Sequence, residues 1–199
     1  MTRPGAFTCT LLSSCLSLWA VSGWPAAREG NEPKKDAPPL EAVVETDVGS
    51  FVMRLLPDVA PNHVRHFVKT VEAHGYDGTT FHRIIPGGIV QGGDPLSKDP
   101  AKAARYGTGG LGLLKAEFSE RPFTRGAVAA VRRPSDIHSG GSQFFVCLRD
   151  QPSLLGQYTL FGEVVEGIEV LDAIGQSPVE GERAKTRIAM RKVTMRGRP

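Results

Sequence analysis

The sequence has little cysteine and no long hydrophobic run in its body. Only 3 of the 199 residues are cysteines, and Cys9 and Cys15 both lie near the N-terminus. Cys147 therefore has no partner for a disulfide within the body of the chain. Beyond the N-terminal region, no stretch reaches the roughly 18 apolar residues that a membrane-spanning helix needs. We expect a body stabilised by its hydrophobic core, with no membrane span.

A strong excess of charge of one sign is also missing. The chain has 24 basic and 21 acidic residues, a net charge of +3, and no basic run longer than two residues. This pattern gives no footprint for nucleic acid. His63, His66 and His74 have no convergent carboxylate in the sequence pattern, so we interpret them as surface histidines and expect no metal.

Residues 1–27 have the layout of a secretory signal peptide. Arg3 precedes a mostly apolar stretch, and small residues follow it at Gly23, Ala26 and Ala27. We expect a secreted or periplasmic protein. An alternative is a lipoprotein anchored at Cys15, because residues 12–15 have the local pattern of a lipoprotein signal.

Residues 28–39 are charged and proline-rich, and they lack aromatic and β-branched side chains. Such a segment cannot bury enough apolar surface to order itself, so we predict a disordered linker. Residues 40–198 are then expected to form one folded domain.

What the body does contain is short apolar runs bounded by glycine and proline. These runs predict strands at residues 41–45, 51–56, 79–85, 89–91, 126–131, 143–148, 158–165 and 187–195. Helical spacing occurs only in residues 58–75 and 167–174. Many short strands with two isolated helices predict a mainly β fold, a closed antiparallel barrel capped by two α-helices.

The most informative segment is residues 79–95, TTFHRIIPGGIVQGGDP, which places Arg83 and Gln91 among alternating apolar residues. Residues two apart in a strand share a face, so we expect Phe81 and Arg83 to point the same way. After the turn at residues 86–88, Ile89 and Gln91 can pair with them. The pattern predicts a polar pair on an apolar wall.

This segment closely resembles the signature strand pair of the cyclophilin family of peptidyl-prolyl cis-trans isomerases. The resemblance extends from residue 40 to about residue 197 and rests on five motifs, at residues 76–83, 91–94, 107–110, 141–145 and 161–167. It implies an eight-stranded barrel with a helix over each end. It also implies cofactor-independent isomerisation of X-Pro bonds in folding proteins, with proline-containing polypeptides as partners.

The resemblance also implies roles for individual residues. Arg83 would be the catalytic arginine, and Gln91 would orient the substrate backbone. The substrate-binding residues would be Phe81, Ile89, Ala130, Val131, Gln143, Phe145, Leu154 and Tyr158. For Phe145 and Leu154 the alternative is plain core packing.

Two departures from the family pattern bear on function. Gly88 stands where the family normally has a large aromatic, a loss of contact worth about 1 to 1.5 kcal/mol. Ser153 stands where cyclosporin-sensitive members have tryptophan, so we expect weak cyclosporin binding. The alternative favoured by Gly88 is a noncatalytic proline-peptide-binding or chaperone module on the same fold. The retained Arg83, Gln91, Gln143 and Phe145 favour the enzyme. We expect a monomer.

Overall fold

A computed structural model describes residues 39–196. The predicted signal peptide, with the alternative lipid anchor at Cys15, and all of the predicted linker except Pro39 lie outside this range. Among the described residues, no helix is long and apolar enough to cross a bilayer.

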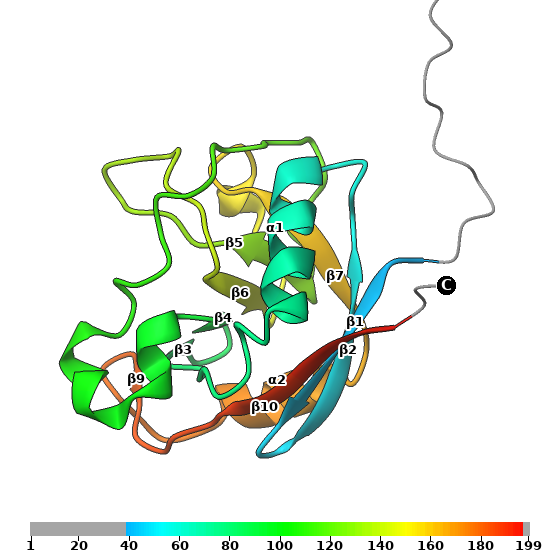
Figure 1. The fold of residues 1–199 in the computed structure, drawn as a ribbon. Helices are drawn as coiled ribbons and strands as arrows, with labels where there is room; N and C mark the ends of the chain where they lie inside the picture. The colour runs from blue at the N-terminus through cyan, green and yellow to red at the C-terminus, as the bar shows by residue number, and fades with distance from the viewer. Residues whose placement is uncertain (1–38, 197–199) are drawn as a thin grey trace, which may run out of the picture. The chain divides into compact units, whose positions relative to one another are not determined.

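The described chain forms ten strands and two α-helices, with three short 3-10 segments (Figure 1). In chain order they are β1 (Glu41–Thr46), β2 (Gly49–Leu55), α1 (Pro61–Glu72), β3 (Arg83–Ile85), β4 (Ile89–Gly92), η1 (Pro95–Lys98), η2 (Pro100–Arg105), β5 (Ala127–Ala130), β6 (Phe144–Cys147), η3 (Pro152–Leu154), β7 (Leu160–Glu166), α2 (Ile168–Gly175), β8 (Val179–Glu180), β9 (Arg183–Ala184) and β10 (Met190–Arg196).

All strand pairs are antiparallel, in the order β10-β1-β2-β7-β5-β6-β4-β3-β9-β8. The predicted mainly β antiparallel fold with two α-helices is confirmed. It differs from the expected barrel in two details. The β8–β9 hairpin adds two strands to the predicted eight, and no regular ladder joins β3 to β10. Instead, Thr80 bridges Ala189, and the N–H of Phe81 donates to the carbonyl of Ile188 over 3.0 Å.

The core consists of the inward-facing side chains of the strands and the buried side chains of α1. In Figure 1, α1 crosses in front of β5, β6 and β7. The buried face of α1 includes Val64, Phe67 and Val71. The ring of Phe67 lies 4.9 Å from that of Tyr76 and 5.7 Å from that of Phe161, centroid to centroid. The hydroxyl of Tyr76 donates to the carbonyl of Ser142, so this buried ring leaves no polar atom unsatisfied.

The N-terminus of α1 is capped by a residue far away in sequence. Ala60 at the N-cap offers no side-chain acceptor. The carboxylate of Glu117 accepts from the backbone N–H groups of Asn62 and His63 instead, and it lies 2.6 Å from Nδ1 of His63. His63 is buried, so its interpretation as a surface histidine is wrong: the ring is held inside by this carboxylate.

Replacing Phe67 with alanine is expected to destabilise the protein by about 3 to 5 kcal/mol, because it leaves a cavity between α1 and the barrel. Urea unfolding followed by circular dichroism measures this loss. Val48→Ala is the control, since Val48 is exposed and its truncation should change the free energy of unfolding by less than about 0.5 kcal/mol. Equal losses for the two variants would contradict this account of the core.

Burial alone would raise the pKa of Glu117, but the hydrogen bonds from His63 and Asn62 outweigh burial and lower it. A lowered folded-state pKa stabilises the fold above the ordinary value of 4.5, and this stabilisation is lost as the pH falls through the folded value. We therefore expect Glu117→Gln to cost about 1 to 2 kcal/mol at neutral pH. The gap from the parent should narrow below pH 4.5, and urea unfolding across this range measures it. A gap that is independent of pH would contradict the role of the carboxylate.

Candidate active site

The strand register places the predicted polar pair on the outer face of the barrel. Arg83 pairs with Gln91, Gln91 with Phe145, and Phe145 with Ala129. The next row in the same strands is apolar and fully buried inside, and it contains Ile84, Val90, Val146 and Val128. Because successive residues alternate between faces, the inner row forces the outer one outward.

A chain of hydrogen bonds connects these polar side chains. Arg83 Nη1 donates to Gln91 Oε1 over 3.0 Å, Gln91 Nε2 donates to Gln143 Oε1 over 3.0 Å, and Gln143 Nε2 donates to the carbonyl of Gly109 over 2.7 Å. A guanidinium only donates and a backbone carbonyl only accepts, so both ends fix the direction of the chain. Each glutamine amide therefore has one orientation.

Glu182, in the turn of the β8–β9 hairpin, holds Arg83 from the other side. Its Oε2 lies 2.7 Å from Nε of Arg83. The guanidinium is thus held by two acceptors, Glu182 at Nε and Gln91 at Nη1, while Nη2 has no partner within the described residues. A donor of fixed position and permanent charge remains available to a ligand.

An apolar seat lies beside this arginine in a cavity of about 930 Å³. The aromatic part of the seat is Phe145 and Tyr158, whose rings meet edge to face at 5.3 Å. Ile89 and Leu154 complete it, and both pack against a buried apolar cluster that includes Phe145, Phe123 and Leu160. The guanidinium of Arg132 lies over Tyr158, 4.8 Å from the ring centroid. A compact apolar group bound here would have charged donors beside it.

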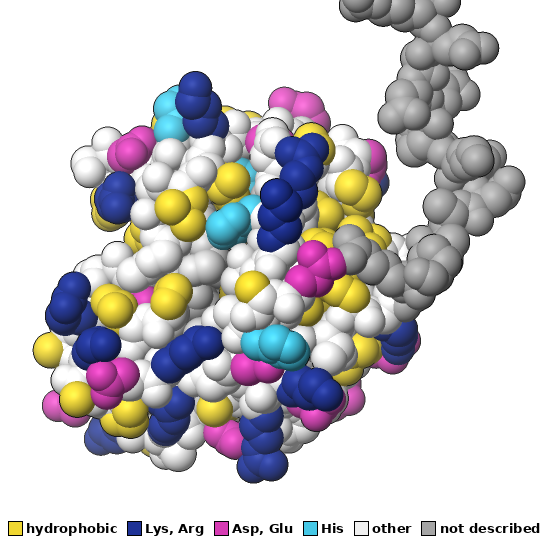
Figure 2. Space-filling view, viewed as in Figure 1, with side chains coloured by type: hydrophobic (Ala, Val, Ile, Leu, Met, Phe, Trp, Pro, Cys, Tyr) yellow, Lys and Arg dark blue, Asp and Glu magenta, His cyan; other side chains and the backbone are white. Residues whose placement is uncertain are grey.

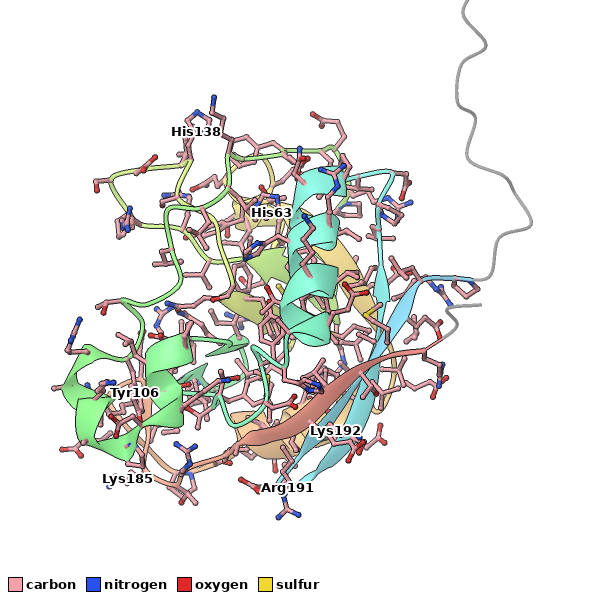
Figure 3. All side chains as sticks on the ribbon, viewed as in Figure 1. His63, Tyr106, His138, Lys185, Arg191 and Lys192 are labelled. Atoms are coloured by element: carbon pink, nitrogen blue, oxygen red, sulfur yellow. The ribbon has the colours of Figure 1, made fainter. Side chains whose placement is uncertain are left out.

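The opposite wall of the cavity is a loop held by one buried carboxylate. Asp94 accepts from the backbone N–H groups of Leu96, Gly107 and Gly109. The loop approaches Gly141 so closely that a Cβ there would collide with the backbone of Gly110. Backbone packing therefore explains Gly141, whereas a Cβ at Gly109 would meet the side chain of Asp94, and Gly107 and Gly110 have positive φ. Tyr106, labelled in Figure 3, follows the 3-10 segment η2 and lines the cavity.

Seven of the ten residues to which the resemblance gives roles line this cavity: Arg83, Ile89, Gln91, Val131, Phe145, Leu154 and Tyr158. Gln143 is fully buried behind it and contacts it through Gln91. Ala130 does not line this cavity but a much smaller space with His63 and Thr159, which shares Val131 and Tyr158 with the cavity.

The expectation that Phe81 shares a face with Arg83 is wrong. Phe81 is buried in the barrel interior, with its ring centroid 6.3 Å from that of Phe51 and 6.4 Å from that of Phe144. Regular strand begins only at Arg83, and the alternation slips by one residue at His82. His82 therefore lines the cavity in place of Phe81.

Neither His82 nor the nearby Cys147 offers strong acid–base or nucleophilic chemistry. His82 is buried with no partner for Nε2 among the described residues, and burial lowers its pKa, so the ring is neutral at pH 7. Burial raises the pKa of the Cys147 thiol to about 12. The site therefore offers charge, donors and an apolar seat.

Sequence reasoning missed several cavity residues: Tyr106, Leu111, Arg149 and Gln151 from loops, and Arg183 from the short strand β9. The glycine motif at 107–110 was the only signal near any of them. Gly88 lines the cavity too, and a Cβ at this position would lie 2.9 Å from Cγ2 of Ile85, so a larger residue needs this side chain to shift.

Comparison with protein families matches residues 42–195 to the model described as cyclophilin type peptidyl-prolyl cis-trans isomerase/CLD. The chain belongs to this family. The predicted family is thereby confirmed, and the protein is a cofactor-independent peptidyl-prolyl cis-trans isomerase.

Named relatives agree with this assignment. A probable peptidyl-prolyl cis-trans isomerase of Brucella suis is 42% identical over 142 residues, covering 69% of this chain and 72% of that protein. Peptidyl-prolyl cis-trans isomerase B of Bacillus subtilis is 40% identical over 124 residues, covering 62% and 81%. The crystal structure of a cyclophilin-type isomerase from Cryptosporidium parvum, determined in the presence of the dipeptide Ala-Pro, shares the fold. It has a TM-score of 0.71 and 24% identity, covering 79% of this chain and 99% of that one.

Replacing Gln143 of this isomerase with methionine keeps the length of the side chain but breaks the chain of hydrogen bonds between Gly109 and Arg83. We expect kcat/KM for an Ala-Pro peptide to fall about tenfold, because the two hydrogen bonds of this amide, from Gln91 and to Gly109, are lost. Protease-coupled isomerisation measures it. Gln157→Met is the matched control, because Gln157 donates to the Ser153 carbonyl outside the cavity. Equal loss in the control would show that the Gln143 amide has no special role.

Proposed function

We propose that this isomerase catalyses X-Pro rotation in the 930 Å³ cavity, with Arg83 as the catalytic residue. One observation carries the proposal: a guanidinium fixed by Glu182 and Gln91 lies in the same cavity as the apolar seat formed by Phe145, Leu154 and their neighbours. The seat has the shape and polarity for a prolyl ring. The charge then lies beside the bond that must rotate.

The reaction needs no nucleophile and no metal. Rotation about a peptide C–N bond faces a barrier of about 18 to 20 kcal/mol because the nitrogen lone pair is delocalised into the carbonyl. In the twisted transition state the lone pair returns to the prolyl nitrogen, and a donor aimed at that nitrogen stabilises it. Arg83 supplies such a donor, pre-positioned and permanently charged, in a partly water-excluded site.

Proline-containing polypeptides are the substrate class that this geometry supports. The Cryptosporidium parvum structure was determined with Ala-Pro, a peptide with the same bond type. Gln91 and Gln143 support a role in orienting the peptide backbone, since their amides are fixed beside Arg83. Gly88 leaves one side of the seat to Ile85 and Gln151, so we propose weaker prolyl contact there than an aromatic would give.

We further propose that the protein acts after export, as a secreted or periplasmic monomer that binds cyclosporin weakly. The layout of residues 1–27 supports export, and the serine at position 153 supports weak cyclosporin binding. Slow prolyl isomerisation limits folding in such compartments as well.

Arg83→Ala is expected to lower kcat/KM for an Ala-Pro peptide by about 10² to 10³, because one preorganised charged donor is removed. Arg83→Lys should be intermediate, since lysine keeps the charge without the fork. The measurement is protease-coupled isomerisation with the full chain. Lys185→Ala controls for loss of an exposed positive charge and should retain the parent rate.

Two outcomes would decide against this assignment. An Arg83→Ala variant as active as the parent would remove Arg83 from the mechanism. A folded parent that binds Pro-containing peptides without accelerating isomerisation would replace catalysis with the proline-peptide-binding or chaperone alternative.

A further inference from the structure

The cavity is strongly basic although the chain as a whole is nearly balanced in charge. Its lining includes five arginines and one glutamate, with no other acidic side chain and no lysine: Arg83, Arg132, Arg133, Arg149, Arg183 and Glu182. The whole sequence has a net charge of only +3. The basic side chains are therefore concentrated around the opening where a peptide would bind.

Four of these five arginines have no carboxylate partner within the described residues. Glu182 is paired with Arg83. The guanidinium groups of Arg132 and Arg133 donate only to backbone carbonyls, among them those of Gln157 and Leu111. These bonds position the two guanidinium groups without neutralising them. For Arg149 and Arg183, both exposed, the described residues provide no ion pair.

Elsewhere on the molecule, several arginines are paired with carboxylates. Arg54, Arg125, Arg191 and Arg196 each form an ion pair with an aspartate or glutamate. Figure 2 shows basic and acidic side chains mixed across one face. The four cavity arginines without an ion pair among the described residues thus differ from the mixture of basic and acidic side chains on that face.

The position of Arg132 connects this charge to the substrate. Its guanidinium lies over the ring of Tyr158, and that ring contacts Phe145 in the apolar seat. A residue adjoining a bound proline lies within about 3.8 Å, Cα to Cα, of it. A carboxylate on such a residue could therefore reach the guanidinium groups at the rim. Charges facing one another across a concave site are attracted more strongly than on an open surface.

On the basis of the proposed function, we propose that the cavity selects X-Pro peptides with an acidic residue adjoining the proline. The unpaired arginines at the rim, Arg132 and Arg133 foremost, are the specificity-determining residues. Glu182 does not cancel the preference, because its carboxylate is engaged by Arg83. The substrate class is then acidic proline-containing segments of unfolded chains.

The test compares peptides that differ only at the residue before proline: Ala-Glu-Pro-Phe, Ala-Gln-Pro-Phe and Ala-Lys-Pro-Phe, with Ala-Ala-Pro-Phe as the neutral reference. A second set carries the same residues after proline, followed by NMR exchange. With the full chain at low salt, kcat/KM should be at least about fivefold higher for Glu than for Gln in one of the two sets, with Lys lowest there. Raising the salt to about 0.5 M should bring the Glu-to-Gln ratio toward one, because added salt shortens the Debye length and so screens the attraction between the charges.

A matched pair of double variants identifies the side chains responsible. In Arg132→Gln/Arg133→Gln, the Glu-to-Gln ratio should fall at least about threefold. Lys69→Gln/Lys192→Gln removes the same charge from α1 and β10, and should leave the ratio as in the parent; Lys192 is labelled in Figure 3 away from Tyr106. The ratio within one variant is independent of a general loss of activity.

The outcomes separate this inference from the function on which it rests. If the neutral peptide is isomerised while Glu and Gln peptides react equally in both sets, the acidic preference is wrong and the isomerase assignment stands. If the ratio is high but the two double variants behave alike, Arg132 and Arg133 are not its source and the inference is overturned. If no peptide is isomerised, the assignment of the catalytic cavity fails as well.

Discussion

One apolar row inside the barrel fixes the chemistry outside it. Ile84, Val90, Val146 and Val128 lie side by side across β3, β4, β6 and β5, and none of them exposes surface. A slip of one residue would turn this row outward and bring Arg83 and Gln91 into the core, where an unpaired guanidinium is very costly. The hydrophobic effect therefore sets the register. The register in turn places Arg83, Gln91 and Phe145 in adjacent positions on the face that forms the cavity.

The orientation of Arg83 depends on parts of the chain that are far apart in sequence. Glu182 reaches it from the β8–β9 hairpin, and the amides of Gln91 and Gln143 connect it to the carbonyl of Gly109. The loop that holds Gly109 is itself fixed by the buried carboxylate of Asp94. Each of these hydrogen bonds has one possible donor and acceptor arrangement, so the side chains that hold Arg83 are fixed. The guanidinium therefore has little conformational freedom to lose when substrate binds. Preorganisation here is a property of the assembled fold.

The cavity also shows how little net charge says about a binding site. A chain with almost equal numbers of basic and acidic residues places four arginines without an ion pair in the described part of the chain around one opening, while others, such as Arg125 and Arg196, pair with carboxylates elsewhere. The local field near Arg132 and Arg133 is what an approaching peptide meets. Gly88 acts in the opposite direction, because it removes apolar contact from the seat. In the proposed selection of acidic peptides, attraction to the charge at the rim would add binding free energy where the seat offers less apolar surface.

By itself, the sequence determined the mainly β class, the two helices and the arginine–glutamine pair, because period-two and helical spacing and the turn glycines are local signals. It also carried the family resemblance that points to Phe145, Leu154 and Tyr158. Only the tertiary structure decided that Phe81 belongs to the core and His82 to the cavity. The sequence pattern does not show where the alternation of strand faces shifts by one residue. The same holds for Glu117 capping α1 and for Glu182 holding Arg83. These contacts join residues separated by 54 and 99 positions, and packing of the whole chain, not local preference, brings such residues together.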